Sequence, residues 1–321
     1  MTGTSRLYEP VKPEMATVES LLRSLSKVEP PWLGEMLEAV LSRGKRMRPA
    51  IALLSGKFGE FQSELLVPLA ASLELLHTAS LVHDDVIDSA GTRRGRPTAG
   101  SLFDNHAAII LGDYIFAQAA SLVARTGSTE VTRLFAETMV VMATAELIED
   151  RGAFNYNQTA DDYLHRNKGK TAALFEIAAY GGALVSRADP RFATALRIYG
   201  DNVGMAFQIV DDILDFTGDA QEMGKPVGSD LMQGTLTMPS LMLIERYPKH
   251  NPVKRLFDAR GGAEHVTRAV EMVRESDILD LSYRSARAYR DRAFEMLETL
   301  PNGPARDSLA ALAEYVLERR I

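Results

Sequence analysis

Apolar residues recur at three- and four-residue spacing along most of the chain, as at Val18, Leu21, Leu22 and Leu25. This spacing places them on one face of an α-helix, whereas the alternating pattern of a half-buried strand is rare. Helix-favouring Leu, Ala, Glu, Arg and Met recur throughout. The sequence therefore predicts an all-α protein of roughly ten or more helices.

Prolines and glycines mark the expected helix ends. Pro30 and Pro31 separate a first helix from a second, Asp189 and Pro190 separate a later pair, and residues 301–304 precede the last helix. The segments from about 67 to 88 and from about 197 to 216 are apolar except at their ends, as expected for central helices of a bundle. Because no long linker interrupts the pattern, we expect a single domain over residues 1–321.

Composition excludes several classes of protein. The chain has no Cys, so disulfides and thiolate metal sites are excluded, and its six His lack zinc-ligand spacing. The formal net charge of −7 argues against general nucleic-acid binding. The N-terminal segment lacks the apolar core of a signal peptide, and no uncharged apolar run reaches the roughly 18 residues of a membrane span. We therefore expect a cytoplasmic protein without a transmembrane segment.

Each of the two apolar segments ends in the motif Asp-Asp-x-x-Asp. The first cluster is Asp84, Asp85 and Asp88, and the second is Asp211, Asp212 and Asp215. Positions i and i+4 share one helix face, so the outer aspartates of each motif project together. Carboxylates beside apolar side chains repel one another unless cations neutralise them. Oxygen ligands suit Mg²⁺, which typically keeps waters and bridges substrate phosphates.

A solvated acidic helix end is the alternative for either cluster alone. If Asp is about a quarter of a typical charged fraction, the motif arises by chance in roughly one chain in thirteen of this length. Two independent copies would arise in about a few chains per thousand on the same assumption. The shared position at an apolar helix end therefore favours two similar sites that face one cavity.

Short basic segments offer partners for phosphate groups. They lie at 44–49, 93–97, 168–171 and 224–226, and none is a Walker loop or an aromatic-lined nucleic-acid groove. Any one of them alone would be interpreted as a solvated turn. Six aspartates and two diphosphates of about −3 each are balanced in charge by three Mg²⁺ and six cations. Those cations are Lys45, Arg48, Arg93, Arg94, Lys170 and Lys225.

In this order and spacing, the motifs resemble those of the trans-isoprenyl diphosphate synthases, also called polyprenyl synthetases. GKRMRP at 44–49 resembles the family's GKRxRP, and residues 75–98 resemble its first aspartate-rich region. Residues 164–175 resemble its Lys-Thr element, and residues 204–231 resemble its second aspartate-rich region. The resemblance covers about residues 44–239. It implies an all-α bundle around a deep central cavity, and a homodimer.

The resemblance also implies three Mg²⁺ per active site. Two would be bound by Asp84, Asp85 and Asp88. A third would be bound by Asp211, with Asp212 and Asp215 in direct or water-mediated contact.

Substrate contacts follow from the same resemblance. The allylic diphosphate would be held by Arg93, Lys170 and Lys225. Isopentenyl diphosphate would be held by Lys45, Arg48, His77 and Arg94. The developing cation would be faced by Gln208 and the Lys170–Thr171 backbone. Thr235 stands where many relatives carry Lys, so one diphosphate contact is expected to be either missing or supplied elsewhere. The glycine-rich segment 223–237 is interpreted as a loop and a candidate lid.

The implied activity is that of a prenyltransferase, which condenses isopentenyl diphosphate with an allylic prenyl diphosphate to give a trans-polyprenyl diphosphate. One isoprene unit is comparable with one helical turn of about 5.4 Å. Ser80 and Ala79, four and five residues before Asp84, are therefore the expected chain-length residues. Both are small, whereas relatives with short products commonly place an aromatic there. We expect a product longer than farnesyl, with geranylgeranyl as the alternative, and Ala79→Phe should shorten it.

Two other functions are compatible with some of these motifs. A class I terpene synthase also ionises a prenyl diphosphate, but its second metal motif usually carries Asn and Ser or Thr. A non-catalytic regulatory subunit usually loses aspartates, and both clusters are complete here. A catalytic-type subunit that needs a partner stays open. We expect no nucleic-acid partner, and transient membrane contact when a long product is released.

Overall fold

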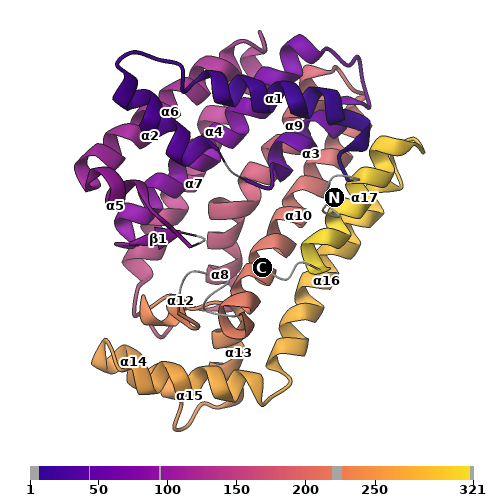
Figure 1. Cartoon of the computed structure of the whole chain (residues 1–321). Coiled ribbons are helices and arrows are strands. Elements are labelled where there is room, and N and C mark those ends of the chain that lie inside the picture. The colour runs from indigo at the N-terminus through magenta and orange to yellow at the C-terminus, as the bar shows by residue number, and fades with distance from the viewer. Residues whose placement is uncertain (1–6, 43, 94, 219–225, 319–321) are drawn as a thin grey trace. The chain divides into compact units, whose positions relative to one another are not determined.

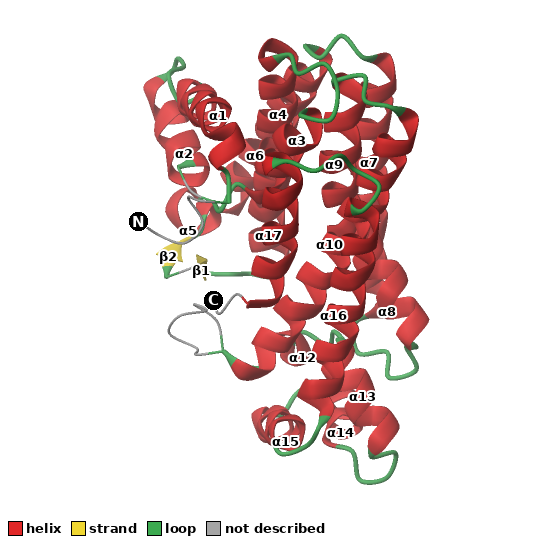
Figure 2. Cartoon of the chain, turned by 90° about the vertical axis from the view of Figure 1, so that its right-hand side faces the viewer, coloured by secondary structure: helices red, strands yellow, loops and turns green. Residues whose placement is uncertain are grey.

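The computed structural model describes residues 7–42, 44–93, 95–218 and 226–318. These residues are almost entirely helical (Figures 1 and 2). The exceptions to helix and loop are β1 (Thr92–Arg93) and β2 (Arg96–Pro97), which form an antiparallel pair with Thr92 opposite Pro97. The prediction of an all-α fold is confirmed.

The chain divides into two compact units. The first comprises residues 1–137, 174–200 and 294–312, and the second comprises residues 138–173, 201–293 and 313–321. The boundaries fall within helices rather than in linkers. The single domain over residues 1–321 stays a prediction.

The first unit contains the N-terminal helices. They are η2 (Glu9–Val11), α1 (Lys12–Ser24), α2 (Pro31–Leu41), α3 (Met47–Gly56), α4 (Ser63–Ile87), α5 (Ala99–Phe103) and α6 (Asn105–Ala124). It also contains most of α9 (Ala173–Val185) and parts of α7 (Thr129–Gly152), α10 (Pro190–Thr217), α16 (Ile278–Leu297) and α17 (Pro304–Glu318). Pro31 and Pro190 each open a helix, because proline at the first helical position leaves no N–H unpaired.

Helix α4 is the core helix of the first unit. It packs against α1, α3 and α6, and its side chains from Leu66 to Leu76 are all buried, so buried positions lie all around its circumference. Each fully buried Leu contributes about 1.5–3 kcal/mol of hydrophobic free energy. The prediction of a central helix over 67–88 is therefore confirmed. His83, interpreted from the sequence as structural, lies with Nε2 3.0 Å from the Ile109 carbonyl of α6.

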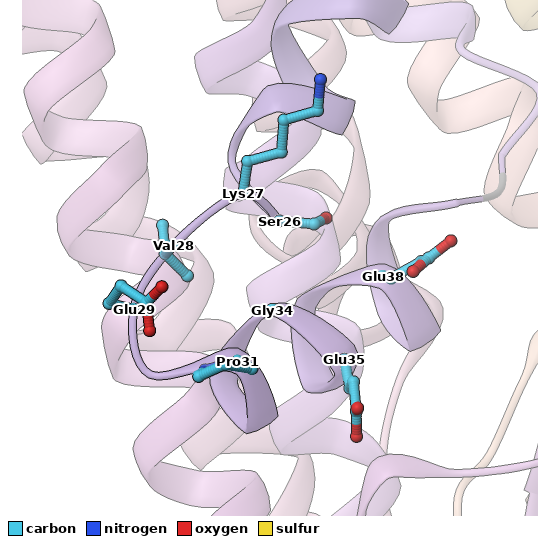
Figure 3. A pocket seen from close by; sticks show the side chains of 8 residues that line it. All are labelled: Ser26, Lys27, Val28, Glu29, Pro31, Gly34, Glu35 and Glu38. Carbon is cyan, nitrogen blue, oxygen red and sulfur yellow. The ribbon is translucent and has the colours of Figure 1, made fainter.

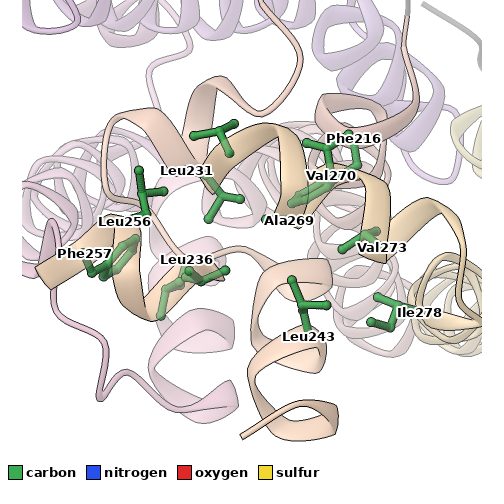
Figure 4. Close-up of a cluster of buried hydrophobic side chains, with 12 residues drawn as sticks. Phe216, Leu231, Leu236, Leu243, Leu256, Phe257, Ala269, Val270, Val273 and Ile278 are labelled. Atoms are coloured by element: carbon green, nitrogen blue, oxygen red, sulfur yellow. The ribbon is translucent and has the colours of Figure 1, made fainter. Parts of the chain in front are cut away.

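The second unit contains the remaining parts of α7, α10, α16 and α17. Its other elements are α8 (Ala160–Asn167), η3 (Lys168–Ala172), α12 (Ser229–Met232), α13 (Met238–Arg246), α14 (Pro252–Ala259) and α15 (Ala263–Arg274). Figure 4 shows one hydrophobic cluster, in which Phe216 at the end of α10 packs with side chains of α12 to α15. A second cluster packs Tyr163 of α8 with Ile209, Val210 and Ile213 of α10. These contacts fix the end of α10, where the second aspartate motif lies.

The sequence predicts a loop over residues 223–237, and the structure corrects part of this prediction. Residues 223–225 lie outside the described residues, but Ser229–Met232 form the short helix α12. The backbone N–H groups of Ser229 and Asp230 donate to the Asp215 carboxylate at 3.2 and 3.3 Å. That side chain is distant in sequence, so local patterning did not reveal the helix.

Two helices, α4 and α6, are long and apolar enough to cross a membrane by length and composition alone. The most apolar window of α4 is 78% buried, as expected for a core helix. That of α6 is only 39% buried. The outer face of α6 is therefore an apolar surface that the first unit itself leaves uncovered.

Candidate functional site

The first aspartate motif occupies the C-terminal end of α4. Asp84 is partly exposed and Asp88, which caps the helix, is exposed, whereas Asp85 is 7% exposed. The buried Asp85 accepts a hydrogen bond from Arg93 Nε at 2.6 Å. Burial raises the pKa of Asp85, and the Arg93 guanidinium opposes this shift. The carboxylates of Asp84 and Asp88 are thus accessible to solvent, whereas that of Asp85 forms an ion pair with Arg93.

The β1–β2 pair positions that arginine. Arg93 lies on β1 opposite Arg96 of β2, and Thr98, which follows β2, donates its hydroxyl to the Ala90 carbonyl at 2.8 Å. The short hairpin therefore folds back onto the end of α4. Arg94, predicted to contact isopentenyl diphosphate, lies outside the described residues.

The first unit also holds the other side chains predicted to bind isopentenyl diphosphate. Lys45 is exposed in the segment before α3, and His77 is partly buried on α4. Arg48 lies in the first turn of α3, is 8% exposed, and stacks over the Phe175 ring with 4.4 Å from Cζ to the ring centroid. The stacked guanidinium is fixed in orientation before any ligand arrives.

In the second unit, the Lys-Thr element and the second aspartate motif are joined by a chain of hydrogen bonds. Thr171 Oγ1 donates to Gln208 Oε1 at 2.6 Å, and Gln208 Nε2 donates to Asp212 Oδ1 at 2.8 Å. Tyr163 OH donates to Asp212 Oδ2 at 2.6 Å. Gln208 and Thr171, which the family resemblance places near the developing cation, are therefore in direct contact through their side chains.

Asp212 is 3% exposed, so both of its hydrogen bonds are made in the interior. Burial and the nearby Asp230 carboxylate raise the pKa of Asp212 to about 8, although the Tyr163 and Gln208 hydrogen bonds oppose the shift. A cation close by would favour the charged carboxylate. Asp212 is therefore an acidic group whose surroundings suit a nearby positive charge.

The other two aspartates of the second motif differ from each other. Asp211 is partly exposed, whereas Asp215 is 1% exposed. Asp215 Oδ1 accepts from the backbone N–H and hydroxyl of Ser229, and Oδ2 accepts from the Asp230 N–H. Asp215 thus anchors α12, and Asp211 is the carboxylate of this motif that reaches the surface.

Lys170 and Thr171 lie on η3, a π-helical turn between α8 and α9. Such single turns occur frequently at functional sites, because the extra residue redirects neighbouring side chains. Lys170 Nζ lies 3.0 Å from Glu146 Oε1 and 2.6 Å from Glu149 Oε1, both on α7. Lys225, its predicted partner on the allylic diphosphate, lies outside the described residues.

Sequence reasoning missed four residues of this region: Glu146, Glu149, Tyr163 and Arg166. Arg166 Nε pairs with Glu149 Oε2 at 3.0 Å, so one glutamate serves both Arg166 and Lys170. The spacing of Glu146 and Glu149 places both on one face of α7, and this signal was available. Their partner, however, lies more than twenty residues further along the chain.

The residues predicted to set chain length lie one turn below Asp84 on α4. Ala79 has no exposed surface, whereas Ser80 is partly buried and donates its hydroxyl to the His77 carbonyl at 2.8 Å. Adjacent helix residues point about 100° apart, so the two side chains face different surroundings. Thr235, the departure from the family pattern, donates its backbone N–H to the Asp230 carbonyl at 2.8 Å.

Two pockets lie away from these side chains. One, of about 520 Å³, lies at the turn between α1 and α2, with Glu29, Glu35 and Glu38 in its lining (Figure 3). The other, of about 300 Å³, is lined by residues of α8, η3, α10 and α16, including Lys168, Asp201 and Arg292. Neither pocket is lined by a predicted metal ligand or diphosphate contact.

Among the described residues, no group of three His, Asp or Glu side chains forms a ready-made metal cage. Mg²⁺ does not require one, because it keeps several waters and is usually bound by one or two carboxylates plus substrate phosphates. Asp84 and Asp88, one turn apart on α4, and Asp211 on α10 provide accessible oxygen donors of this kind. The residues therefore fit Mg²⁺ that is bound together with a diphosphate.

The contact between Tyr163 and Asp212 gives a first prediction. Tyr163→Phe removes the hydroxyl and leaves a buried carboxylate oxygen unsatisfied, which should cost about 1–3 kcal/mol of stability. We also expect a higher Mg²⁺ concentration for half-maximal activity, because Asp212 loses its orientation.

Tyr199→Phe is the matched control. Tyr199 is fully buried, and its hydroxyl donates to the Leu309 carbonyl at 2.7 Å, away from both aspartate motifs. The control should lower thermal stability without changing the Mg²⁺ dependence. Equal Mg²⁺ curves for the two variants would contradict an orienting role for Tyr163.

On an all-helical scaffold, each of the two Asp-Asp-x-x-Asp motifs exposes a carboxylate that fits a divalent cation, and each unit holds Lys or Arg side chains that suit a diphosphate. The family described as Polyprenyl synthetase matches residues 30–273 of this chain. The chain is 37% identical over 314 residues to "Heptaprenyl diphosphate synthase component 2" of Bacillus subtilis (strain 168), which covers 98% of this chain and 90% of the relative. The chain belongs to the polyprenyl synthetase family and is a prenyltransferase.

Solved structures of similar proteins support the same family assignment. Heptaprenyl diphosphate synthase from Staphylococcus aureus is 33% identical, with a TM-score of 0.92 over 96% of this chain and 98% of that one. Polyprenyl synthase from Caulobacter crescentus CB15, solved with calcium and isoprenyl diphosphate, is 30% identical, with a TM-score of 0.94 over 99% of this chain and 98% of that one. Family membership sets aside the class I terpene synthase alternative.

Proposed function

We propose that this chain is a long-chain trans-polyprenyl diphosphate synthase, which adds isopentenyl diphosphate units to an allylic prenyl diphosphate. One observation carries the proposal. Both complete aspartate motifs end buried helices and expose Asp84, Asp88 and Asp211, in a chain similar over 98% of its length to a heptaprenyl diphosphate synthase component.

Polyprenyl synthetases are typically Mg²⁺-dependent, and we extend this to three ions per active site. Asp84 and Asp88 would hold two of them and Asp211 the third, with Asp85, Asp212 and Asp215 behind these ligands. When bound, the ions supply positive charge that stabilises the diphosphate as it leaves.

The chain's own residues bind and orient the two substrates. Lys170, held by Glu146 and Glu149, and Arg93, held by Asp85, are fixed cations for the allylic diphosphate. Gln208, which contacts Thr171, and the Lys170–Thr171 backbone would face the positive charge that develops on the allylic carbon. Lys45 and the stacked Arg48 hold isopentenyl diphosphate for attack. Among the residues that the structure describes, no side-chain base is evident, so we assign the final proton to the departing pyrophosphate.

A product longer than farnesyl follows from two observations. Ala79 and Ser80 leave the first turn of α4 below Asp84 without an aromatic ring. The relative from Bacillus subtilis and the structure from Staphylococcus aureus both carry heptaprenyl in their names.

The test is a direct assay. Purified protein is incubated with labelled isopentenyl diphosphate, farnesyl diphosphate and Mg²⁺, and chain lengths are separated by chromatography. We expect products beyond the C20 geranylgeranyl length. Absence of any elongated product under these conditions would contradict the function for the chain acting alone.

A catalytic subunit that needs a partner is the second candidate. The specific observation is the word "component" in the name of the Bacillus subtilis relative. Elongation by the purified chain alone rejects this alternative. An inactive chain that regains elongation in a lysate of its own source would establish it.

We also propose that the active form is a homodimer. In the first unit, Leu102 of α5 and Ile109 and Ile110 of α6 are exposed. In the second unit, the α7 segment exposes Val140, Val141, Leu147 and Ile148 at helical spacing. Exposed apolar faces of this kind are typical of protein interfaces, and a second copy of the chain would cover them.

Ile110→Glu tests the dimer. One buried, unpaired carboxylate on each copy costs several kcal/mol, so the dimer dissociation constant should rise at least about tenfold. Sedimentation velocity measures this shift. The control Ile198→Glu, at an exposed isoleucine of α10, should leave the sedimentation coefficient unchanged. A dimer that persists in Ile110→Glu would exclude this face.

A further inference from the structure

Arg46 lies in the middle of the basic segment 44–49, yet the sequence predicted no substrate contact for it. Its side chain is 5% exposed, whereas the adjacent Lys45 is exposed. Arg46 is therefore a buried cation inside a motif whose other basic residues are expected to meet phosphate.

The guanidinium of Arg46 uses three nitrogens on three elements. Nε donates to Glu19 Oε1 of α1 at 2.7 Å, Nη1 donates to Glu74 Oε1 of α4 at 2.7 Å, and Nη2 donates to the carbonyl of Leu41 at the end of α2 at 2.6 Å. Glu74 is 4% exposed, so its pair with Arg46 is shielded from water. One side chain thus ties the basic segment to the helix that carries the first aspartate motif.

The backbone around Arg46 depends on this pair. Arg46 caps α3 with φ 52° and ψ 34°, a left-handed conformation that is uncommon for a residue with a side chain. Gly44 has φ +149°, and a Cβ there would lie 2.7 Å from Glu74 Oε1. Unfavourable conformations persist when surrounding contacts determine them, and the buried ion pair provides those contacts.

The pair lies beside the side chains expected to bind isopentenyl diphosphate. With Arg46 turned inward, its neighbour Lys45 is turned outward, and Tyr8 OH donates to the Lys45 carbonyl at 2.8 Å. Arg48 follows two residues later on α3. Glu74 precedes His77 by three residues on α4, so the two share one face of that helix.

We propose that Arg46, through its buried ion pair with Glu74, is a positioning residue that sets the geometry of the isopentenyl diphosphate subsite without touching substrate. This inference rests on the proposed function. Arg is required because its planar fork serves three acceptors in fixed directions, whereas Lys offers a single point charge.

The experiment measures two Michaelis constants. Arg46→Lys and Glu74→Gln are assayed with isopentenyl diphosphate varied at saturating farnesyl diphosphate, and then the reverse. We expect KM for isopentenyl diphosphate to rise about tenfold, equivalent to about 1.4 kcal/mol, with KM for farnesyl diphosphate unchanged. The control Arg268→Lys, in the exposed pair with Glu271 on α15, should change neither constant.

A paired replacement separates positioning from folding. Removing one member of a buried ion pair destabilises a protein, whereas replacing both with apolar residues often restores stability. Arg46→Met combined with Glu74→Leu should therefore approach wild-type thermal stability while KM for isopentenyl diphosphate stays raised. If the double variant regained the wild-type KM, apolar packing alone would position the segment and the proposal would be overturned.

The outcomes also separate this inference from the proposed function. A wild-type protein that makes no condensation product would contradict both the proposed function and this inference. If the wild type is active but Arg46→Lys keeps the wild-type KM for isopentenyl diphosphate, the positioning role is contradicted. An equal rise in both Michaelis constants would contradict it too. In either case the proposed function still stands.

Discussion

Asp84→Ala and Asp211→Ala should each abolish Mg²⁺-dependent condensation, with turnover lower by at least about a thousandfold. Each variant removes an accessible carboxylate that fits Mg²⁺ at the end of a buried helix. A bound metal supplies several kcal/mol of transition-state stabilisation, and each 1.4 kcal/mol or so is a factor of ten in rate. Product formation at saturating substrates is measured across a range of Mg²⁺ concentrations.

Asp258→Ala, at an exposed aspartate of α14, is the matched control and should keep wild-type turnover. Because Asp84 and Asp211 are partly exposed, their loss should leave the melting temperature close to wild type, which separates chemistry from folding. Near-normal turnover in either variant would show that its carboxylate is not a metal ligand.

Ala79→Phe should shorten the product, which is the second large effect. A phenyl ring placed one turn below Asp84 would block an isoprenyl chain that grows along α4, so products should stop near farnesyl or geranylgeranyl. Ala79 has no exposed surface, so the added ring must displace the side chains packed against it. Chain lengths are read by chromatography after incubation with isopentenyl diphosphate and farnesyl or geranyl diphosphate.

Ser80→Phe is the companion variant, because Ser80 is partly exposed and points about 100° away from Ala79. Shortening in only one of the two variants identifies the side of α4 along which the chain grows. Folded, active variants that both keep the wild-type product distribution would contradict growth along this helix.

Much of the fold could be predicted from the sequence because its signals are local. Helical spacing of apolar residues and the positions of prolines gave the helix order, and Pro31 and Pro190 do open helices. The aspartate motifs, together with the basic segments, predicted the family and the reaction class, and both are confirmed.

The partners of the site residues could not be predicted in the same way. Tyr163 and Asp212 are 49 residues apart in sequence, and Lys170 lies 24 residues from Glu146. Such contacts depend on tertiary packing, which residue spacing does not encode. Arg46 shows the same limit, since a sequence pattern does not distinguish a cation that faces phosphate from one that faces a buried glutamate.

The two aspartate motifs differ at their last residue. Asp88 and Asp215 are each the last residue of an Asp-Asp-x-x-Asp motif. Asp88 is exposed to solvent, whereas Asp215 accepts hydrogen bonds from the backbone N–H groups at the start of α12. Two copies of the same motif in one chain therefore have different roles at their last aspartate. The equivalent substitution at these two places should impair turnover at Asp88 and local folding at Asp215.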